Sequence, residues 1–523
     1  MPLPSDAPET TRRRAGLLLM LLAVAAVAGG GWLRTAHLDG APLHADEAAT
    51  GAWVLAERLE QGRYTFEPRH HHGPLLTAST APVAAVRGES GWNDLTATTL
   101  RAVPVAAGVF TLLMILGTAP TLRGGAAVAA VFAATSPLLV VYSRVYIHET
   151  LQGAGVALLI VAALRYAARP AWSWALTAGV AAGLMLSNKE TAVITGVAWF
   201  AAGVTLAFGQ GLRRHHRLDL RHAARRHGTG TTLAFAAAAG VVVCFYSDFG
   251  RHPAGVLDFV RTFFVYETDT GHHKPVNYYA WLMAWPKLRG GFWWTEAAVL
   301  TFAAIGFAAS FRDPRGGAVR FLGLAAAAEA LAYSLIAYKT PWLGVVTWIQ
   351  VCIVAGCGAV WLLSVRPVWG RGLAGVALAA AVAWQTQQAV RAAHRFPADD
   401  RNPYAYVPTS PGIENLAPWL EELTAAAPAI RDAPLAVVGR NHWPLTWYLR
   451  AFDRVGYWPD YPDGVAGLPL VLVIPDVAEA SDAPSPLDAT HTALPRSLRT
   501  DTPVVVYVRH DVWSAYLTTR DAP

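Results

Sequence analysis

Charged residues are scarce in this chain. Asp, Glu, Lys and Arg make up 15% of its 523 residues, whereas ordinary globular proteins contain roughly 25%. Hydrophobic residues make up 54%, so too few polar side chains remain to cover the apolar surface of a water-soluble fold. The composition therefore excludes an ordinary soluble protein and indicates that lipid is the solvent for much of the chain.

Cysteine is scarce as well. The three cysteines, Cys244, Cys352 and Cys357, each lie in an apolar run. Because no pair of them occupies a polar loop, the sequence predicts neither a disulfide framework nor a zinc finger. The chain also lacks an internal repeat of fixed period and a heptad pattern, so a repeat array or a coiled coil is not expected.

A net charge of +6 is the one feature that could suggest a nucleic-acid partner. The arginines, however, lie in short loops between apolar runs, which is the pattern that sets the orientation of membrane proteins. No nucleic-acid partner is expected.

Apolar runs of helix-spanning length dominate the first 394 residues. A membrane-spanning helix needs about 20 apolar residues, and eleven runs approach that length. The first follows three arginines and resembles a signal peptide, but we interpret it as an uncleaved helix because ten more spans follow. The runs are 15–33, 97–118, 125–142, 149–168, 172–187, 191–208, 229–247, 292–311, 318–338, 342–364 and 371–388.

The distribution of Arg predicts the orientation of these spans. Residues 209–228 hold six Arg, so this loop is expected in the cytoplasm, and alternation places the N-terminus there too. Two long loops, 34–96 and 248–291, and everything after residue 394 then lie outside. We predict a polytopic α-helical membrane domain over 1–394 and a C-terminal extracytoplasmic α/β domain over 395–523.

The C-terminal segment differs in composition from the rest of the chain. It is rich in Pro and acidic, with 16 Asp and Glu against 10 Arg. Short β-like runs at 435–438, 470–474 and 504–508, with helix-like stretches near 412–425 and 443–452, predict a small α/β fold.

An acidic pair, Asp46-Glu47, opens the first long outside loop. Asp is a favoured N-cap and Glu complements the helix dipole in a first turn, so the pair could simply begin a helix. Alternatively, a carboxylate in a cleft at the membrane face could act as a general base.

The order of these features resembles the GT-C class of membrane glycosyltransferases. An Asp-Glu pair in a long first outside loop, after the first of about eleven spans, is similar to the protein O-mannosyltransferase branch, which includes aminoarabinose transferases. Further motifs resemble a GT-C-like subfamily of flippase-activity-associated membrane proteins. They are HGP at 72–74, YKTPWL at 338–343 and WPLTWYLR at 443–450.

The resemblance implies a reaction. Such enzymes pass a sugar from a polyprenyl-phosphate carrier to an acceptor, which can be a glycan, a lipid or a protein, on the outer side of the bilayer. The first-loop Asp is the base, a role that carries over to Asp46, with Glu47 as its partner. Arrangements in the family also suggest a second acidic position at Glu149 and a carrier contact at Lys189.

Three cations are the only ones in the short outside loops: Arg144, Lys189 and Lys339. Positioned cations stabilise the charge that develops on a leaving phosphate, so we expect these three to hold the carrier phosphate. Snorkelling to lipid headgroups is the alternative. The remaining expected substrate contacts are His72, His148, His272 and Trp342.

Histidine-rich segments at 70–72 and 272–273 raise the question of a metal. Imidazole and carboxylate groups suit zinc or manganese, yet consecutive His residues cannot readily face one ion and no metal-binding spacing is present. We assign no metal ligands and leave a divalent cofactor open.

Glu329 lies inside an expected span, where acids are costly and often functional. The resemblance to the flippase-associated subfamily keeps two alternatives open. One is a lipid-linked sugar flippase or a component associated with one, and the other is an inactive scaffold whose tail binds a partner. Transporters usually carry polar residues at the midplane within repeated halves, whereas the other candidates here lie at the outer rim. The enzyme is therefore the favoured reading.

Overall fold

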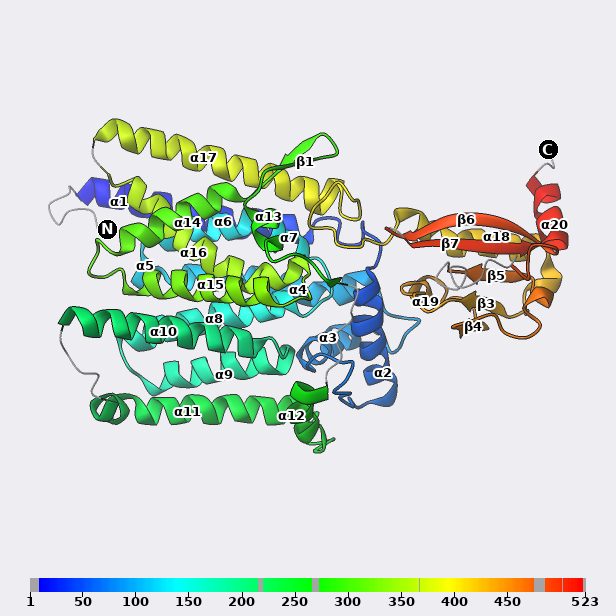
Figure 1. Cartoon of the computed structure of the whole chain (residues 1–523), viewed down its shortest axis with the longest axis horizontal. Helices are drawn as coiled ribbons and strands as arrows, with labels where there is room; N and C mark the ends of the chain where they lie inside the picture. The colour runs from blue at the N-terminus through cyan, green and yellow to red at the C-terminus, as the bar shows by residue number, and fades with distance from the viewer. Residues whose placement is uncertain are drawn as a thin grey trace.

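The computed structural model describes residues 9–214, 220–265, 272–365, 367–474, 485–500 and 502–520. The protein has a bundle of roughly parallel helices with a small sheet domain at one end (Figure 1). The elements of the first half are α1 (Glu9–Thr35), η1 (Glu47–Ala52), α2 (Trp53–Gln61), α3 (Leu75–Val86), α4 (Ala97–Gly117), α5 (Ala119–Leu122), α6 (Gly124–Thr135), α7 (Pro137–Tyr142), α8 (Glu149–Ala168), α9 (Trp172–Asn188), α10 (Ala192–Arg214) and α11 (Leu220–Tyr246).

The second half completes the bundle and adds the sheet domain. Its bundle elements are α12 (Gly255–Val265), α13 (Tyr278–Met283), β1 (Lys287–Arg289), β2 (Phe292–Trp294), α14 (Ala297–Ser310), α15 (Gly317–Leu335), η3 (Pro341–Gly344), α16 (Val345–Leu362), α17 (Val368–Val390) and η4 (Arg391–Arg395). The sheet domain holds η5 (Pro411–Asn415), α18 (Leu416–Ala426), η6 (Pro428–Ile430), β3 (Leu435–Val438), α19 (Leu445–Tyr448), β4 (Val455–Trp458), η7 (Val465–Gly467), β5 (Leu470–Val473), β6 (His491–Arg499), β7 (Thr502–Arg509) and α20 (His510–Arg520).

The fold class predicted from the sequence is confirmed: a helical membrane protein with a C-terminal sheet domain. Seven helices in the described part of the chain are long and apolar enough to cross a membrane. Of the other expected spans, 371–388 lies in the continuous 23-residue helix α17, which is less apolar, and the rest are shorter helices or are interrupted. Ser136 ends α6 and caps α7, with Pro137 at the first helical position, so the run 125–142 is two helices.

One expected span needs a correction. The run 292–311 begins as strand β2, which pairs with β1 in a hairpin, and α14 starts only at Ala297. The three aromatic residues at 292–294 are apolar enough to extend the hydrophobic run, but aromatics are also favoured in strands. Hydropathy alone could not distinguish a strand from the start of a helix at residues 292–294.

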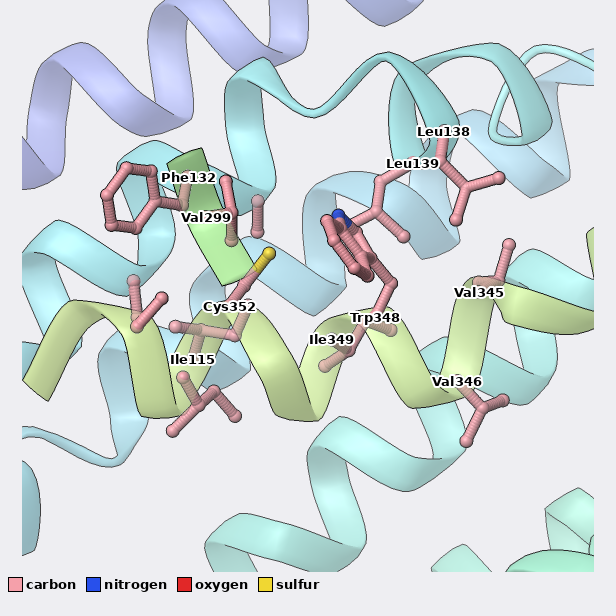
Figure 2. Packing of buried hydrophobic residues seen from close by; sticks show 14 of the residues in the cluster. Ile115, Phe132, Leu138, Leu139, Val299, Val345, Val346, Trp348, Ile349 and Cys352 are labelled. Carbon is pink, nitrogen blue, oxygen red and sulfur yellow. The ribbon is translucent and has the colours of Figure 1, made fainter. Parts of the chain in front are cut away.

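Helix α16 lies at the centre of the bundle. Its residues Val345, Trp348, Ile349 and Cys352 pack against side chains from α4, α6, α7 and α14 (Figure 2). Glycine permits the closest approaches: a Cβ on Gly356 would collide with the backbone of α6, and one on Gly358 with that of α14. Small residues at such contacts let helix backbones pack closely where lipid provides no hydrophobic driving force.

The sheet domain has five strands in the order β4-β3-β5-β7-β6. Strands β3, β4 and β5 are parallel, while β7 is antiparallel to both β5 and β6. Alternate residues face opposite sides of a strand, and here Val437 and Leu472 pack with α18 and α20, whereas Val438 and Val473 face a second, smaller cluster.

The three β-like runs of the tail are confirmed as β3, β5 and β7. The expected helix at 443–452 is wrong in length, since only α19 is helical there. Strands β4 and β6 were not expected from the sequence. Pro495 within β6 weakens a strand pattern and β6 lies at the edge of the sheet, where Pro is tolerated.

The sheet domain contacts the first long loop of the bundle. Arg450 donates hydrogen bonds to the carbonyls of Trp92 and Leu95, and its guanidinium lies 3.7 Å from the ring centre of Trp447. The motif at 443–450 therefore holds the domain against the loop that carries Asp46.

Candidate functional site

The first long loop places Asp46 directly before the π-helical turn η1. Turns of this type are frequent at functional sites. The side chain of Asp46 makes no capping hydrogen bond and remains 44% exposed. The interpretation of Asp46 as a simple helix cap is therefore wrong, and its carboxylate is accessible to a substrate.

Glu47, the neighbour of Asp46, is in the opposite situation. Its carboxylate is 1% exposed and forms an ion pair with Arg101 at 2.8 Å. It also accepts hydrogen bonds from the backbone amides of His44 and Tyr146. Burial alone would raise the pKa of Glu47, but the Arg101 guanidinium and these two amides outweigh it and hold the pKa below its ordinary value.

Arg101 is a residue that the sequence reasoning missed. It lies in α4, and besides Glu47 it donates hydrogen bonds to the carbonyls of Leu38, Ala41 and Pro42. It thereby fixes the loop between α1 and Asp46. A charged residue inside an apolar run is a signal in its own right, and that signal could have identified it.

His44 is a second residue that was missed. Its Nδ1 accepts a hydrogen bond from the amide of Asp46 at 3.1 Å, and its Nε2 lies 2.9 Å from the carbonyl of Tyr406. Since Nδ1 accepts, the proton is on Nε2, which donates to Tyr406. His44 therefore joins the Asp46 turn to residues near the start of the sheet domain.

Three separate loops meet beside Asp46. Lys189 forms an ion pair with Glu149 at 2.6 Å, and His72 contacts Glu190 at 3.1 Å. The rings of His72 and His148 lie edge to face, 5.0 Å apart. The structure thus brings together four residues predicted for the site, and it adds Glu190. We call these five residues the rim cluster.

Gly73 permits this meeting of loops. A Cβ at this position would collide with the backbone of Ser187 and Asn188, so only glycine lets the loop after His72 approach the end of α9. The HGP motif therefore has a steric reason for its glycine.

The rim cluster changes the proton affinity of its members. Burial alone would lower the pKa of Lys189, but the carboxylates of Glu149, Glu190 and Asp46 outweigh it and raise that pKa. Burial alone would raise the pKa of Glu190, but His72 and Lys189 lower it to about 2. Burial, with a further contribution from His72 and Lys189, holds the pKa of His148 well below its ordinary value.

Arg144 and Lys339 lie outside the rim cluster and contact backbone carbonyls, although Arg144 lines a small cavity together with His44 and Glu47. Arg144 donates hydrogen bonds to the carbonyls of Leu33, Arg34, Ala36 and His37 at the end of α1. Lys339, 1% exposed, donates to the carbonyls of Lys274 and Ile336. Neither interaction is snorkelling to lipid, and both side chains hold loops in place.

His272 and Trp342 lie on the other side of His44. His272 contacts the hydroxyl of Tyr406 at 2.6 Å, and the ring of Trp342 packs edge to face on those of His44 and Tyr406. His44, Glu47, Arg101, Trp342 and Tyr406 line a small cavity of about 60 Å³. This cavity and the rim cluster flank the Asp46 turn.

A larger apolar groove runs between α14, α15 and α16. It has a volume of about 500 Å³, and its lining includes Tyr279, Phe307, Leu331, Gly344 and Val351. The hydroxyl of Tyr279 donates to the carbonyl of Thr340, so this end of the groove lies next to the turn that carries Trp342. A long hydrocarbon chain could occupy such a groove.

Glu329 has partners that the sequence could not supply. Its carboxylate accepts hydrogen bonds from Thr195 on α10 and from Thr347 and Gln350 on α16. As for a metal, no group of three or more His, Cys, Asp or Glu residues in the described part of the chain is arranged to hold one.

Comparison with known proteins supports the fold. The family model of dolichyl-phosphate-mannose-protein mannosyltransferase matches residues 71–243, a segment that contains the rim cluster but not Asp46. No curated protein matches the chain by sequence.

Two solved structures share its architecture. ArnT from Cupriavidus metallidurans in the apo state has a TM-score of 0.62 and 14% identity, over 94% of this chain and 98% of that one. The oligosaccharyltransferase AglB from Archaeoglobus fulgidus, in complex with an inhibitory peptide and a dolichol-phosphate, has a TM-score of 0.53 and 12% identity, over 95% and 77%. The chain thus shares the fold of these two structures over nearly its whole length.

Proposed function

We propose that this protein is a membrane glycosyltransferase that moves a sugar from a polyprenyl-phosphate carrier to an acceptor hydroxyl at the outer membrane face. Asp46 takes the proton of the acceptor hydroxyl. The acceptor oxygen then bonds to the anomeric carbon while the bond to the carrier phosphate breaks, and the phosphate leaves with the electron pair.

The contrast between Asp46 and Glu47 is the observation that carries this proposal. The two adjacent carboxylates lie in different environments: that of Asp46 is accessible, whereas both oxygens of Glu47 accept hydrogen bonds from Arg101. A general base must be able to reach the proton that it abstracts, which only Asp46 of the pair can do. In this assignment Glu47, with Arg101, positions the turn, and Glu149 positions Lys189.

The carrier would use the apolar groove and the rim cluster. ArnT has been crystallised bound to undecaprenyl phosphate, and the groove of about 500 Å³ suits such a chain. Lys189 is within the electrostatic influence of Asp46, so among the three predicted cations we assign it to the leaving phosphate. His72, His148, His272 and Trp342 are then the contacts for sugar and acceptor.

The location follows from the same proposal. The apolar helices indicate a membrane protein, and the distribution of arginines favours a cytoplasmic N-terminus with the sheet domain outside. Reporter fusions at Gln210 and at the C-terminus should report opposite sides of the membrane.

A flippase-related role, as in the subfamily that the sequence resembles, is the alternative. Glu329 bears on it, because an acid inside the bundle could belong to a transport path. Its hydrogen bonds join α10 and α16 to α15, as expected of a group that packs helices together. This observation favours the enzyme.

Reconstituted protein can separate the two roles. In sealed proteoliposomes that contain a polyprenyl-phosphate sugar and a soluble acceptor, a transferase releases polyprenyl phosphate. A flippase instead moves the intact lipid between leaflets without release. We expect release with wild type and with Asp39→Asn, a matched change at an exposed carboxylate of the same loop, and release slowed by roughly 10²–10⁴-fold with Asp46→Asn. Equal release by Asp46→Asn and wild type would refute the assigned base, and transbilayer movement without release would refute the transferase.

A further inference from the structure

Two arginines at the end of α17 have side chains that are not used by the site described above. Arg391 and Arg395 are one turn apart in η4, the π-helical continuation of α17. Figure 1 shows this end of α17 beside the β1–β2 hairpin. It lies at the same end of the bundle as the Asp46 loop, because the ring of His394 packs on the ring of Trp32 in the last turn of α1 and on that of His37 just after α1.

A single aromatic ring brings the two guanidinium groups together. The guanidinium carbon of Arg391 lies 4.2 Å from the ring centre of Phe292, and that of Arg395 lies 5.5 Å from it. Burial lowers the pKa of Arg391, and the nearby charge of Arg395 adds to this effect.

Neither guanidinium has an acidic partner or a side-chain hydrogen bond among the described residues. The acid that follows them in the chain, Asp399, is paired with Arg401 at 2.5 Å. Each guanidinium carries five N–H donors in a planar fork that suits a phosphate group. Two like charges one turn apart repel each other, and an anion between them would relieve that repulsion.

A shallow, open hollow lies along α17 beside the pair. Ala383, Thr386, Gln387 and Val390 line it together with the two arginines, so one face of α17 and η4 forms all of it. A lipid with an anionic headgroup would fit this face, since its chain could lie along α17 while its phosphate contacts the arginines.

The site faces away from Asp46. Ala392 and Ala393, the residues between the two arginines, line the small cavity next to His44 and Glu47 on the other side of η4. A carrier held by Arg391 and Arg395 could not present its sugar to Asp46 through that layer. We propose that Arg391, Arg395 and Phe292 form a binding site for the phosphate of an anionic phospholipid of the surrounding leaflet, separate from the carrier site.

Native mass spectrometry of the purified full chain tests this site. The protein is reconstituted with phosphatidylglycerol and phosphatidylcholine in equal amounts, and the lipids that remain bound are counted. Each basic residue near a membrane surface contributes about a factor of five to anionic-lipid binding. We therefore expect the double variant Arg391→Gln/Arg395→Gln to hold phosphatidylglycerol roughly 25-fold more weakly than wild type.

Two further variants test whether the position and the charge of the arginines matter. Arg371→Gln removes an arginine from the opposite end of α17 and should leave retention of phosphatidylglycerol unchanged. Arg391→Lys/Arg395→Lys keeps the charge and should restore part of it. Equal retention of phosphatidylglycerol by the Gln double variant and wild type would overturn the proposal. So would equal retention of the two lipids by wild type, or a site that retains undecaprenyl phosphate but not phosphatidylglycerol.

Discussion

Buried carboxylates are satisfied in two different ways in this molecule. In the rim cluster and at Glu47, each buried or partly buried acid contacts a basic side chain: Glu149 with Lys189, Glu190 with His72, and Glu47 with Arg101. Among the helices, Glu296 accepts hydrogen bonds from Ser136, Tyr404, Trp348 and Gln385, and Glu329 from two Thr hydroxyls and one Gln amide. Uncharged hydrogen-bond donors thus hold Glu296 and Glu329, where basic side chains hold the acids at the rim.

The two kinds of partner indicate two roles for the buried acids, one close to the proposed reaction and one in the packing of the helices. Charged pairs lie at the rim, beside the accessible Asp46, where a substrate can exchange contacts with them. Neutral donors hold Glu296 and Glu329 between helices, where a buried polar group needs partners to offset the loss of water. We therefore expect changes at the rim to alter activity or charge-dependent stability, and changes among the helices to alter packing alone.

The largest expected effect is on turnover by Asp46→Asn. The variant keeps the shape of the side chain but cannot accept the acceptor proton, so kcat should fall by roughly 10²–10⁴-fold. KM for the carrier should change little, because Asn leaves the groove and Lys189 in place. Steady-state kinetics with a polyprenyl-phosphate sugar measures both quantities.

Stability provides the control for this variant. Asp46 makes no capping bond through its side chain, so the thermal midpoint of Asp46→Asn should match that of wild type. Wild-type kcat in a normally folded variant would show that another carboxylate is the base.

The second prediction concerns the ion pair next to Asp46. Glu47→Ala leaves Arg101 buried at 2% exposure without its partner. Loss of one member of a buried pair costs about 3–5 kcal/mol, so the free energy of unfolding should fall by about that amount. Denaturant titration in detergent measures it, and a loss below about 1 kcal/mol would show that the pair does not hold the turn.

The sequence predicts the fold well where a signal is long. Apolar runs of helix length are found as helices, and three strands of the tail lie where β-branched residues cluster. Most failures are elements of three or four residues, namely β2 inside an apolar run, α19 shorter than its pattern, and β4, which was not expected. The nine-residue strand β6 was also not expected, because Pro495 weakens its strand pattern. Over three to nine residues, edge position and hairpin pairing decide the structure, and a single sequence does not contain that information.

The site was predicted in part for a similar reason. The grouping of His72, His148, Glu149 and Lys189 follows from loops on one membrane face. Arg144 and Lys339 also lie in such loops, but each contacts backbone carbonyls, which no pattern of side chains reveals. His44 and Arg101 were missed because their roles depend on distant partners, Tyr406 for the one and Glu47 for the other.

The third prediction tests packing among the helices. Glu329→Leu roughly keeps the size of the side chain but removes the two oxygens that accept hydrogen bonds from Thr195, Thr347 and Gln350. The buried donors lose their acceptor, at a cost of about 1–3 kcal/mol. The thermal midpoint should fall, while kcat measured below it stays at the wild-type level. A large loss of kcat without loss of stability would place Glu329 in the chemistry or in a transport path.

The smallest expected effect is a change in pH dependence at Glu190. The pKa of this carboxyl is about 2 in the folded protein, below its ordinary value of 4.5, so its ionised form stabilises the fold. That stability is fully present above about pH 4.5 and is lost as the pH falls from 4.5 towards 2, because protonation removes the contact with His72. Glu190→Gln cannot titrate, so its thermal midpoint should fall less steeply than that of wild type across this window, while both proteins keep a similar dependence above pH 5. Parallel curves for the two proteins from pH 5 to pH 2 would show that Glu190 is not held as an ion in the rim cluster. The contrast between acids paired with cations at the rim and Glu329, which neutral donors hold, would then not apply to Glu190.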